Sequence, residues 1–284
     1  MAVAALILVV HLVPSTRARP VRRRHGHRPP CLLSVGVSGL HGLQTMDTTL
    51  RSYVERGLAN VADQTFVFYQ EADKPFSNGL TKRALVQRHG FDFYGHATNS
   101  KWVSVHDVVR HARCKYVVFL EEDWLLFPTN KTVVRDEIRA ALALLESGKV
   151  HVVRERSRYH SGEPNHALLM HERGDSFGDT HLLHSVFWSE DPAKLHPSRI
   201  WRCHQSPPYW CAKSANADFS LNPVVFGVDW WRRVVQPLMP GGDFNPDLGF
   251  HGQWGALDVT VAQGMGLFMH NRLDRDPDVD APPH

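Results

Sequence analysis

KYVVFLEEDW, residues 115–124, is the stretch that decides the fold. Its apolar run, YVVFL, is continuous, β-branched and aromatic, which is typical of a strand covered on both faces and predicts a position near the middle of a sheet. Three carboxylates, Glu121, Glu122 and Asp123, follow without a break. In open α/β sheets ligands gather where the strands end, because the loops diverge there and leave a crevice.

Carboxylate oxygens at such a strand end suit Mg²⁺ or Mn²⁺, which can bridge a diphosphate and neutralise it when it acts as a leaving group. The alternative is that the EED run is a solvated strand end, or negative charge that favours the N-terminus of the following helix. The residues themselves therefore predict a candidate site for a metal ion and a diphosphate, and no more specific chemistry.

From Cys31 onward, short apolar runs alternate with amphipathic stretches, which predicts βα units around an open, mostly parallel sheet flanked by helices. The expected strands are residues 32–37, 65–70, 91–95, 116–120 and 150–153, and the expected helices are residues 46–58, 80–85, 102–112 and 133–145. Beyond Arg154 the chain becomes rich in His, Pro and Trp, with further apolar runs at 185–188 and 222–231. No linker separates this less regular half from the first.

The first 30 residues predict a targeting segment followed by a basic stalk. Residues 2–13 are apolar apart from His11, and six arginines follow before residue 29. This apolar stretch is too short to span a bilayer and suits the core of a signal peptide; a truncated signal anchor and a buried element of the domain are the alternatives. Without those six arginines, 26 of the 32 basic residues remain against 29 acidic ones, which argues against nucleic-acid binding.

The cysteines and a sequon agree with passage through the secretory pathway. Cys203 and Cys211 flank an SPPYW turn and can close a small disulfide loop. Cys31 and Cys114 each precede a predicted strand, and their sulfurs can meet if those strands are parallel neighbours. Free core thiols are the alternative for both pairs. With the N-K-T sequon at Asn130, the pattern favours a glycoprotein of the Golgi or ER lumen, attached to a membrane only through the N-terminal segment.

Two segments carry a resemblance to a known family. HARCKYVVFLEEDWLLF, residues 111–127, resembles the part of GT-A glycosyltransferases, including the family 2 group, in which a helix leads into an apolar strand and a D-x-D or D-D acidic motif. VAQGMGLFMHNRLDR, residues 261–275, is similar to a C-terminal element of the same class. The resemblance implies one GT-A-like domain over 31–275, with a nucleotide-binding half at 31–154, an acceptor half at 155–275 and a tail at 276–284. Glu121 departs from the strict motif, which has Asp there.

The same resemblance implies roles for individual residues. Asp123 corresponds to the principal metal ligand, Glu121 to a further ligand nearer the ribose or a bridging water, and His270 to the histidine that completes the shell of Mn²⁺ or Mg²⁺. A purely structural role is the alternative for a lone His after an apolar strand. The residues expected to contact the nucleotide sugar at the ends of the first strands are Ser38, Glu71, Asp73 and Lys101, together with Glu121.

The second half is expected to supply the base and the acceptor groove. Inverting transfer needs a carboxylate that takes the proton of the acceptor hydroxyl, and Asp247 in FNPDLGFHGQW matches the helix start where related enzymes place it; an ordinary helix cap is the alternative. Aromatic faces pack on the C–H faces of sugars, so the density of aromatic residues suggests a carbohydrate acceptor groove. A Trp-rich core is the alternative and accounts for most of these residues, with Trp210 and Trp254 as the two expected to be exposed. The aromatic residues of this half are Trp201, Trp210, Trp230, Trp231 and Trp254, with Tyr209.

The resemblance thus predicts a metal-dependent enzyme that transfers a hexosyl or N-acetylhexosaminyl group from a nucleotide-sugar donor to a hydroxyl of a glycan or glycoconjugate. A catalytically silent, carbohydrate-binding relative and a sugar nucleotidyltransferase are the alternatives. Nucleotidyltransferases usually carry a basic, Gly-rich loop after the first strand, and SGLHGLQT at residues 38–45 contains neither Lys nor Arg, which counts against the latter.

Overall fold

The computed structural model describes residues 31–40, 42–96, 101–158, 182–186, 189–221, 223–239 and 250–271, together with residue 273. The targeting segment, the tail from residue 276 and Asp247 lie outside these residues, so the predictions about them stay predictions. None of the helices in the described part combines the length and hydrophobicity that a bilayer crossing requires.

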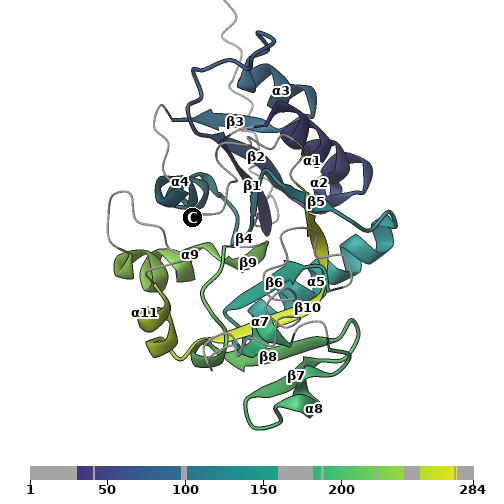
Figure 1. Ribbon diagram of the computed structural model, residues 1–284, viewed down its shortest axis with the longest axis vertical. Helices are drawn as coiled ribbons and strands as arrows, with labels where there is room; N and C mark the ends of the chain where they lie inside the picture. Colours follow the sequence, from purple (N-terminus) through teal and green to yellow (C-terminus); the bar gives the residue numbers. More distant parts are fainter. Residues whose placement is uncertain are drawn as a thin grey trace, which may run out of the picture. The chain divides into compact units, whose positions relative to one another are not determined.

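The strands form one ten-stranded sheet in the order β3-β2-β1-β4-β9-β6-β10-β8-β7, with β5 paired to β10 (Figure 1). Their bounds are β1 (Leu33–Gly39), β2 (Gln64–Tyr69), β3 (Asp92–Gly95), β4 (Tyr116–Glu121), β5 (Trp124–Leu126), β6 (Val152–Arg156), β7 (Ile200–His204), β8 (Tyr209–Lys213), β9 (Val224–Gly227) and β10 (Thr260–His270). Strands β1 to β4 are parallel to one another, β6 is parallel to β10, and β9 runs antiparallel between β4 and β6. The predicted largely parallel α/β sheet, with the YVVFL strand inside it, is confirmed.

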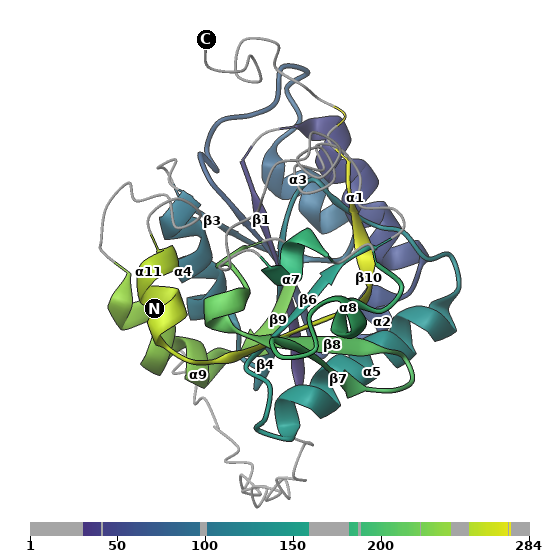
Figure 2. The ribbon, with the colours of Figure 1, turned by 60° about the horizontal axis from the view of Figure 1, so that its bottom comes forward.

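Helices cover both faces of the sheet (Figures 1 and 2). One apolar core joins the sheet to α1, α2, α3 and α5, and a second core on the other face joins it to α4, α7, α11 and the turn η3. The bounds are α1 (Leu43–Glu55), α2 (Leu58–Val61), α3 (Lys82–Arg88), α4 (Lys101–His111), α5 (Lys131–Glu146), α7 (Leu182–Ser185), α8 (Pro192–Leu195), η2 (Ser214–Asn216), α9 (Val228–Trp230), η3 (Trp231–Val235), η4 (Gln236–Leu238) and α11 (His251–Ala256).

Helix α5 shows why these residues form these elements. Asn130 begins it as the N-cap, because its side chain accepts a hydrogen bond of 2.9 Å from the backbone N–H of Thr132. The predicted helical face is buried apart from Val133, which is 47% exposed, and Gly148, in a left-handed conformation with φ of 69°, follows the end of the helix. The residues of that face include Val134, Ile138, Leu142 and Leu145.

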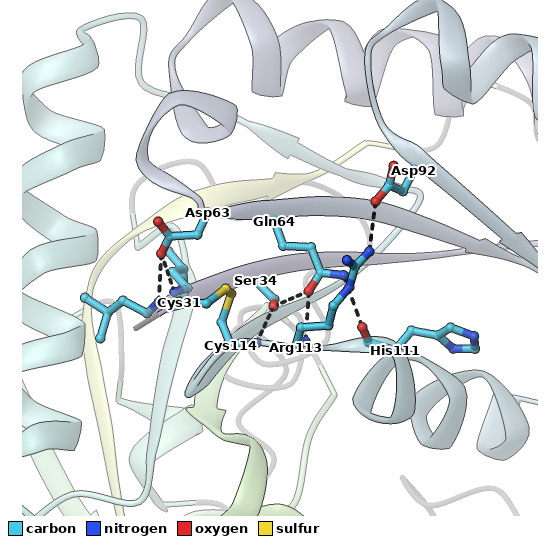
Figure 3. The surroundings of a disulfide bond; sticks show 10 residues. Cys31, Ser34, Asp63, Gln64, Asp92, His111, Arg113 and Cys114 are labelled. Carbon is cyan, nitrogen blue, oxygen red and sulfur yellow. Dashed lines mark hydrogen bonds and ion pairs between the residues drawn. A yellow bond between two sulfur atoms is a disulfide. The ribbon is translucent and has the colours of Figure 1, made fainter. Parts of the chain in front are cut away.

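Two disulfides are present among the described residues, and each joins a pair of cysteines that the sequence offered as a candidate, with free thiols as the alternative. Cys31 bonds to Cys114 beside the parallel starts of β1 and β4, and Cys203 bonds to Cys211 within the hairpin β7–β8. Figure 3 shows the first of them, where Asp63 accepts hydrogen bonds of 2.8 and 3.1 Å from the backbone N–H groups of residues 32 and 33. The Cys31–Cys114 disulfide and the two Asp63 hydrogen bonds lie at the strand starts, at the end of the sheet opposite the acidic loop.

The second half departs from the sequence-based expectation in three places. Strand β6 continues to Arg156 although its last residues are charged, because distant partners satisfy them: Arg154 forms an ion pair of 3.0 Å with Asp218. The hairpin β7–β8 was not predicted. Helix α7, which takes in Ser185 from the apolar run at 185–188, was not predicted either, and Val186 lies in a turn.

A pair of buried carboxyl groups lies between α5 and the sheet. Glu137 on α5 and Glu155 on β6 are 4% and 0% exposed, and the Tyr209 hydroxyl donates a hydrogen bond of 3.0 Å to Glu155 Oε1. Burial raises the pKa of both carboxyls, most strongly that of Glu155, where the charge of Glu137 adds to the effect. The folded protein therefore holds protons on this pair that the unfolded chain releases.

This pair makes a prediction about stability and pH. A carboxyl whose pKa is higher in the folded state lowers stability as the pH rises from its ordinary value near 4.5 through the folded value. We expect Glu155→Gln to be more stable than the unmodified protein at pH 8 and to lose less stability between pH 5 and pH 8 in urea unfolding. Glu146→Gln, at an exposed position of α5, is the control and should keep the original slope; an unchanged slope in Glu155→Gln would contradict this account.

Candidate active site

Strand β10 changes partners along its length, and this change brings the two ends of the candidate site together. Its first half pairs with β6 and β8, and its last three residues pair with β5. Between these halves β10 advances five residues, Gln263 to Phe268, while β6 advances two, Arg154 to Arg156. The resulting bulge turns the end of β10 toward the acidic loop.

Gly266 makes this bulge possible. Its φ is 75°, and a Cβ there would lie 2.0 Å from the backbone oxygen of Arg156. Only glycine fits such a position without strain. Backbone hydrogen bonds from Met265 and Gly266 reach the Glu137 carboxyl and tie the bulge to α5.

Asp123 and His270 meet at the C-terminal edge of the sheet. His270 lies opposite Trp124 in the β10–β5 register, and its Nε2 lies 3.0 Å from Asp123 Oδ2. The backbone N–H of Asn271 donates a hydrogen bond of 2.7 Å to the Asp123 carbonyl, and both side chains of the pair are 18% exposed. Residues 147 positions apart in the sequence are thus held together, as the resemblance implied.

The donor set fits a divalent cation. Asp123 Oδ1 is buried and has no hydrogen-bond partner within the described part of the chain, so it is an oxygen open to a ligand. A carboxylate beside an imidazole suits Mn²⁺, and also Mg²⁺ when phosphate oxygens and water fill the other positions. Glu121 does not complete a compact set: among the described residues, the one group of three ligand atoms lying mutually within 4.8 Å is Cys31, Asp63 and Cys114, whose sulfurs form the disulfide.

Helix α1 and strand β6 support the acidic loop from behind. The Tyr53 hydroxyl donates a hydrogen bond of 2.5 Å to the Trp124 carbonyl, and burial raises the pKa of Tyr53 well above its ordinary value, with added effect from the charges of Asp123 and Glu122. The Arg156 guanidinium lies 5.2 Å from the Trp124 ring centroid. No pattern in the sequence singled out Tyr53 or Arg156, because both contacts join distant elements.

The predicted nucleotide-contacting residues lie around the same edge. Ser38 is opposite Glu121 in the β1–β4 register, and its hydroxyl contacts that of Ser104 on α4. Glu71 and Asp73 lie in the loop after β2, where Glu71 has φ of 47° and forms an ion pair of 2.7 Å with Lys74. Lys101 begins α4, and its side chain lies outside what the structure describes.

Lys82 joins the loop after β1 to the loop after β2. Its ammonium group donates hydrogen bonds of 3.3, 3.0 and 2.9 Å to the carbonyl oxygens of Leu40, Gln70 and Glu71, which end β1 and β2. Burial lowers the pKa of Lys82, while the charges of Glu71, Glu122 and Asp73 act in the opposite direction. These carboxylates therefore surround one buried cation, which the sequence alone did not reveal.

The prediction that Trp210 and Trp254 are exposed is wrong. Trp210 and Trp254 are both 2% exposed, and their indole N–H groups donate hydrogen bonds of 3.1 Å to Asp191 and 2.7 Å to the Ala217 carbonyl. Buried partners therefore satisfy the indoles, as a Trp-rich core requires. Trp201, on the edge strand β7, is instead 40% exposed.

Neither a protein-family model nor a curated protein sequence matches this chain. Solved structures are similar in fold. TarS residues 1–349 from S. aureus has a TM-score of 0.48 and 10% identity, over 84% of this chain and 60% of that one. Glucosyl-3-phosphoglycerate synthase from Mycobacterium tuberculosis, with Mn²⁺, UDP and phosphoglyceric acid, has a TM-score of 0.48 and 13% identity over 88% and 73%.

The mannosyltransferase PcManGT from Pyrobaculum calidifontis, with GDP-Man and Mn²⁺, has a TM-score of 0.35 and 15% identity over 45% of this chain and 36% of that one. The chain spans less than two thirds of the length of the TarS and PcManGT chains. The ligands named for the synthase and the mannosyltransferase are those of these two proteins.

Proposed function

We propose that this protein is a metal-dependent glycosyltransferase, which moves a sugar from a nucleotide-sugar donor to a hydroxyl of a glycan or glycoconjugate. The observation that carries the proposal is the contact between Asp123 and His270, with the unpartnered Asp123 Oδ1 beside it. The two residues come from the two segments that resemble GT-A glycosyltransferases, and they meet where an open α/β sheet binds its ligands.

Asp123 and His270 would hold Mn²⁺ or Mg²⁺. A cation bound there supplies charge neutralisation to the diphosphate as the bond between it and the anomeric carbon breaks. In an inverting transfer the acceptor oxygen forms the new bond to that carbon, and its proton passes to a carboxylate, for which Asp247 is the sequence-based candidate. The backbone at the ends of β1 and β2, held by Lys82, would form the nucleotide side, with Ser38, Glu71, Asp73, Lys101 and Glu121 as its proposed contacts.

The proposed location is the lumen of the ER or Golgi, with attachment to the membrane through the N-terminal segment. The two disulfides support this location, because such bonds persist in oxidising compartments. Asn130 is exposed at the start of α5, so the sequon is accessible to modification. The type of sugar transferred is proposed to be a hexosyl or N-acetylhexosaminyl group.

A thermal-shift panel tests this function. UDP- and GDP-sugars are added with and without Mn²⁺, and donors that raise the melting temperature are then assayed for sugar release and for transfer to glycan acceptors. Because a ligand that binds only the folded state stabilises it, the true donor should raise the melting temperature in a metal-dependent way. Stabilisation without release or transfer favours a catalytically silent relative, and the absence of any metal-linked shift contradicts the proposed function.

A further inference from the structure

A groove of about 620 Å³ lies at the opposite end of the sheet from the candidate active site. The C-terminal end of α5 and the hairpin β7–β8 line it, and Thr260 contributes to its lining. Thr260 is the first residue of β10 and His270 is the last. The bulge shortens β10 to the length of about seven strand residues, and at about 3.3 Å per residue the groove lies roughly 20 Å along the strand from the acidic loop. It is therefore separate from the metal site.

An exposed aromatic ring and apolar side chains line this groove. Trp201 projects from the edge strand β7 at 40% exposure, and it lies opposite Cys211 of the disulfide in the β7–β8 register. Leu144 and Val150 provide apolar surface from the end of α5 and the following turn. A broad indole face that remains partly in water is a surface on which the C–H face of a sugar ring can pack.

The groove also carries positive charge. Lys149, in the turn before β6, is exposed and its ammonium group has no ionic partner among the residues that the structure describes. Lys213 at the end of β8 is 3.3 Å from Asp258, whose side chain is 77% exposed and so neutralises it only weakly. The ring of His204 also lines the groove, with Nδ1 2.7 Å from the Pro207 carbonyl oxygen. The positive charge and the aromatic ring together favour a ligand that carries an anionic group and a flat apolar face.

We propose that this groove binds an acidic saccharide, a sugar unit carrying a carboxylate or a sulfate. Trp201 would pack against the ring, and Lys149 and Lys213 would pair with the anionic group. The choice of a carbohydrate rests on the proposed function, because an enzyme that acts on a glycan meets such units. At roughly 20 Å along β10 from the acidic loop, the groove would hold a remote part of the acceptor glycan and keep the enzyme on it.

Calorimetric titration of the full chain tests the proposal. The probes are oligosaccharides of matched length: hyaluronan, which carries carboxylates; chondroitin sulfate, which carries both groups; and neutral chitin fragments. We expect at least one acidic probe to bind, more weakly at high salt. Trp201→Ala and Lys149→Glu should each weaken that binding roughly tenfold. Comparison of the two acidic probes shows whether carboxylate or sulfate is recognised.

Matched controls separate this site from its surroundings. Lys131→Glu reverses a charge at the other end of α5, and Leu195→Ala removes an exposed apolar side chain from α8; both should bind as the unmodified protein does. Asp123→Asn should keep acidic-saccharide binding, so a failure of the proposed catalysis is distinguishable from a failure of this site. Equal binding of the neutral probe, unchanged binding in both groove variants, or polyglutamate binding with the same losses would overturn the proposal.

Discussion

Asp123→Asn is expected to reduce metal-dependent sugar transfer by roughly 100- to 1,000-fold, the range seen when one transition-state contact to developing charge is lost. The substitution preserves shape and can keep the contact with His270, but it removes the negative charge that would hold the cation. Because asparagine can keep a hydrogen bond with His270 at this largely buried position, where both side chains are 18% exposed, the melting temperature should change little. Transfer rates at saturating Mn²⁺ and melting curves measured on the same preparation check both expectations.

Asp136→Asn is the matched control for this variant. Asp136 is an exposed residue of α5 whose carboxylate pairs with the neighbouring Arg135 at 3.0 Å. The control should transfer sugar at the unmodified rate. A fully active Asp123→Asn protein would contradict the assignment of Asp123 as the metal ligand.

Gly266→Ala is expected to lower the free energy of unfolding by about 3 kcal/mol, combining the strain of a left-handed residue with overpacking. The added Cβ would lie 2.0 Å from the Arg156 backbone oxygen, so β6 and the bulge of β10 must separate. For a domain of this size the melting temperature should fall by roughly 6 to 12 °C. Metal-linked nucleotide binding should weaken as well, because the bulge directs His270 toward Asp123.

Gly90→Ala separates the strain of the backbone from the steric clash. Gly90 has a φ of 79°, similar to that of Gly266, but a Cβ there meets no atom within 4 Å. It should lower the free energy of unfolding by only about 1 kcal/mol and leave nucleotide binding unchanged. Equal losses for the two variants would show that the close approach of Arg156 does not constrain the bulge.

The regular half of the fold was predictable because its pattern is local. Strands β1 to β4 are short apolar runs separated by helical periodicity, and the boundaries from sequence agree with the structure within about two residues. The predicted strand at 150–153 stops before the observed end of β6, because charged residues such as Arg154 and Glu155 usually mark the end of a strand. Their burial depends on Asp218 and Tyr209, which lie more than 50 residues away in the sequence. Hydrophobic periodicity carries no information about such partners.

The two residues that meet at the candidate site were predictable from the sequence, but the elements that hold them in place were not. The acidic run and the C-terminal GLFMH element suggested Asp123 and His270 through their resemblance to a family. The bulge at Gly266 and the buried ammonium of Lys82 depend on how strands pair, which the sequence does not reveal. The tryptophans make the same point: Trp210 was expected to be exposed, yet it is 2% exposed and its indole N–H donates a hydrogen bond to Asp191, which lies 19 residues earlier in the chain.

Titration of Mn²⁺ into the protein, with and without UDP or GDP, tests the central claim most directly. If Asp123 and His270 hold a cation that bridges a nucleoside diphosphate, Mn²⁺ should bind more tightly when the correct nucleotide is present, and the nucleotide should bind more tightly with Mn²⁺ by the same factor. Both effects should be lost in Asp123→Asn and strongly reduced in His270→Ala. Nucleotide binding that is indifferent to Mn²⁺, or metal-linked binding that survives both substitutions, would contradict the account.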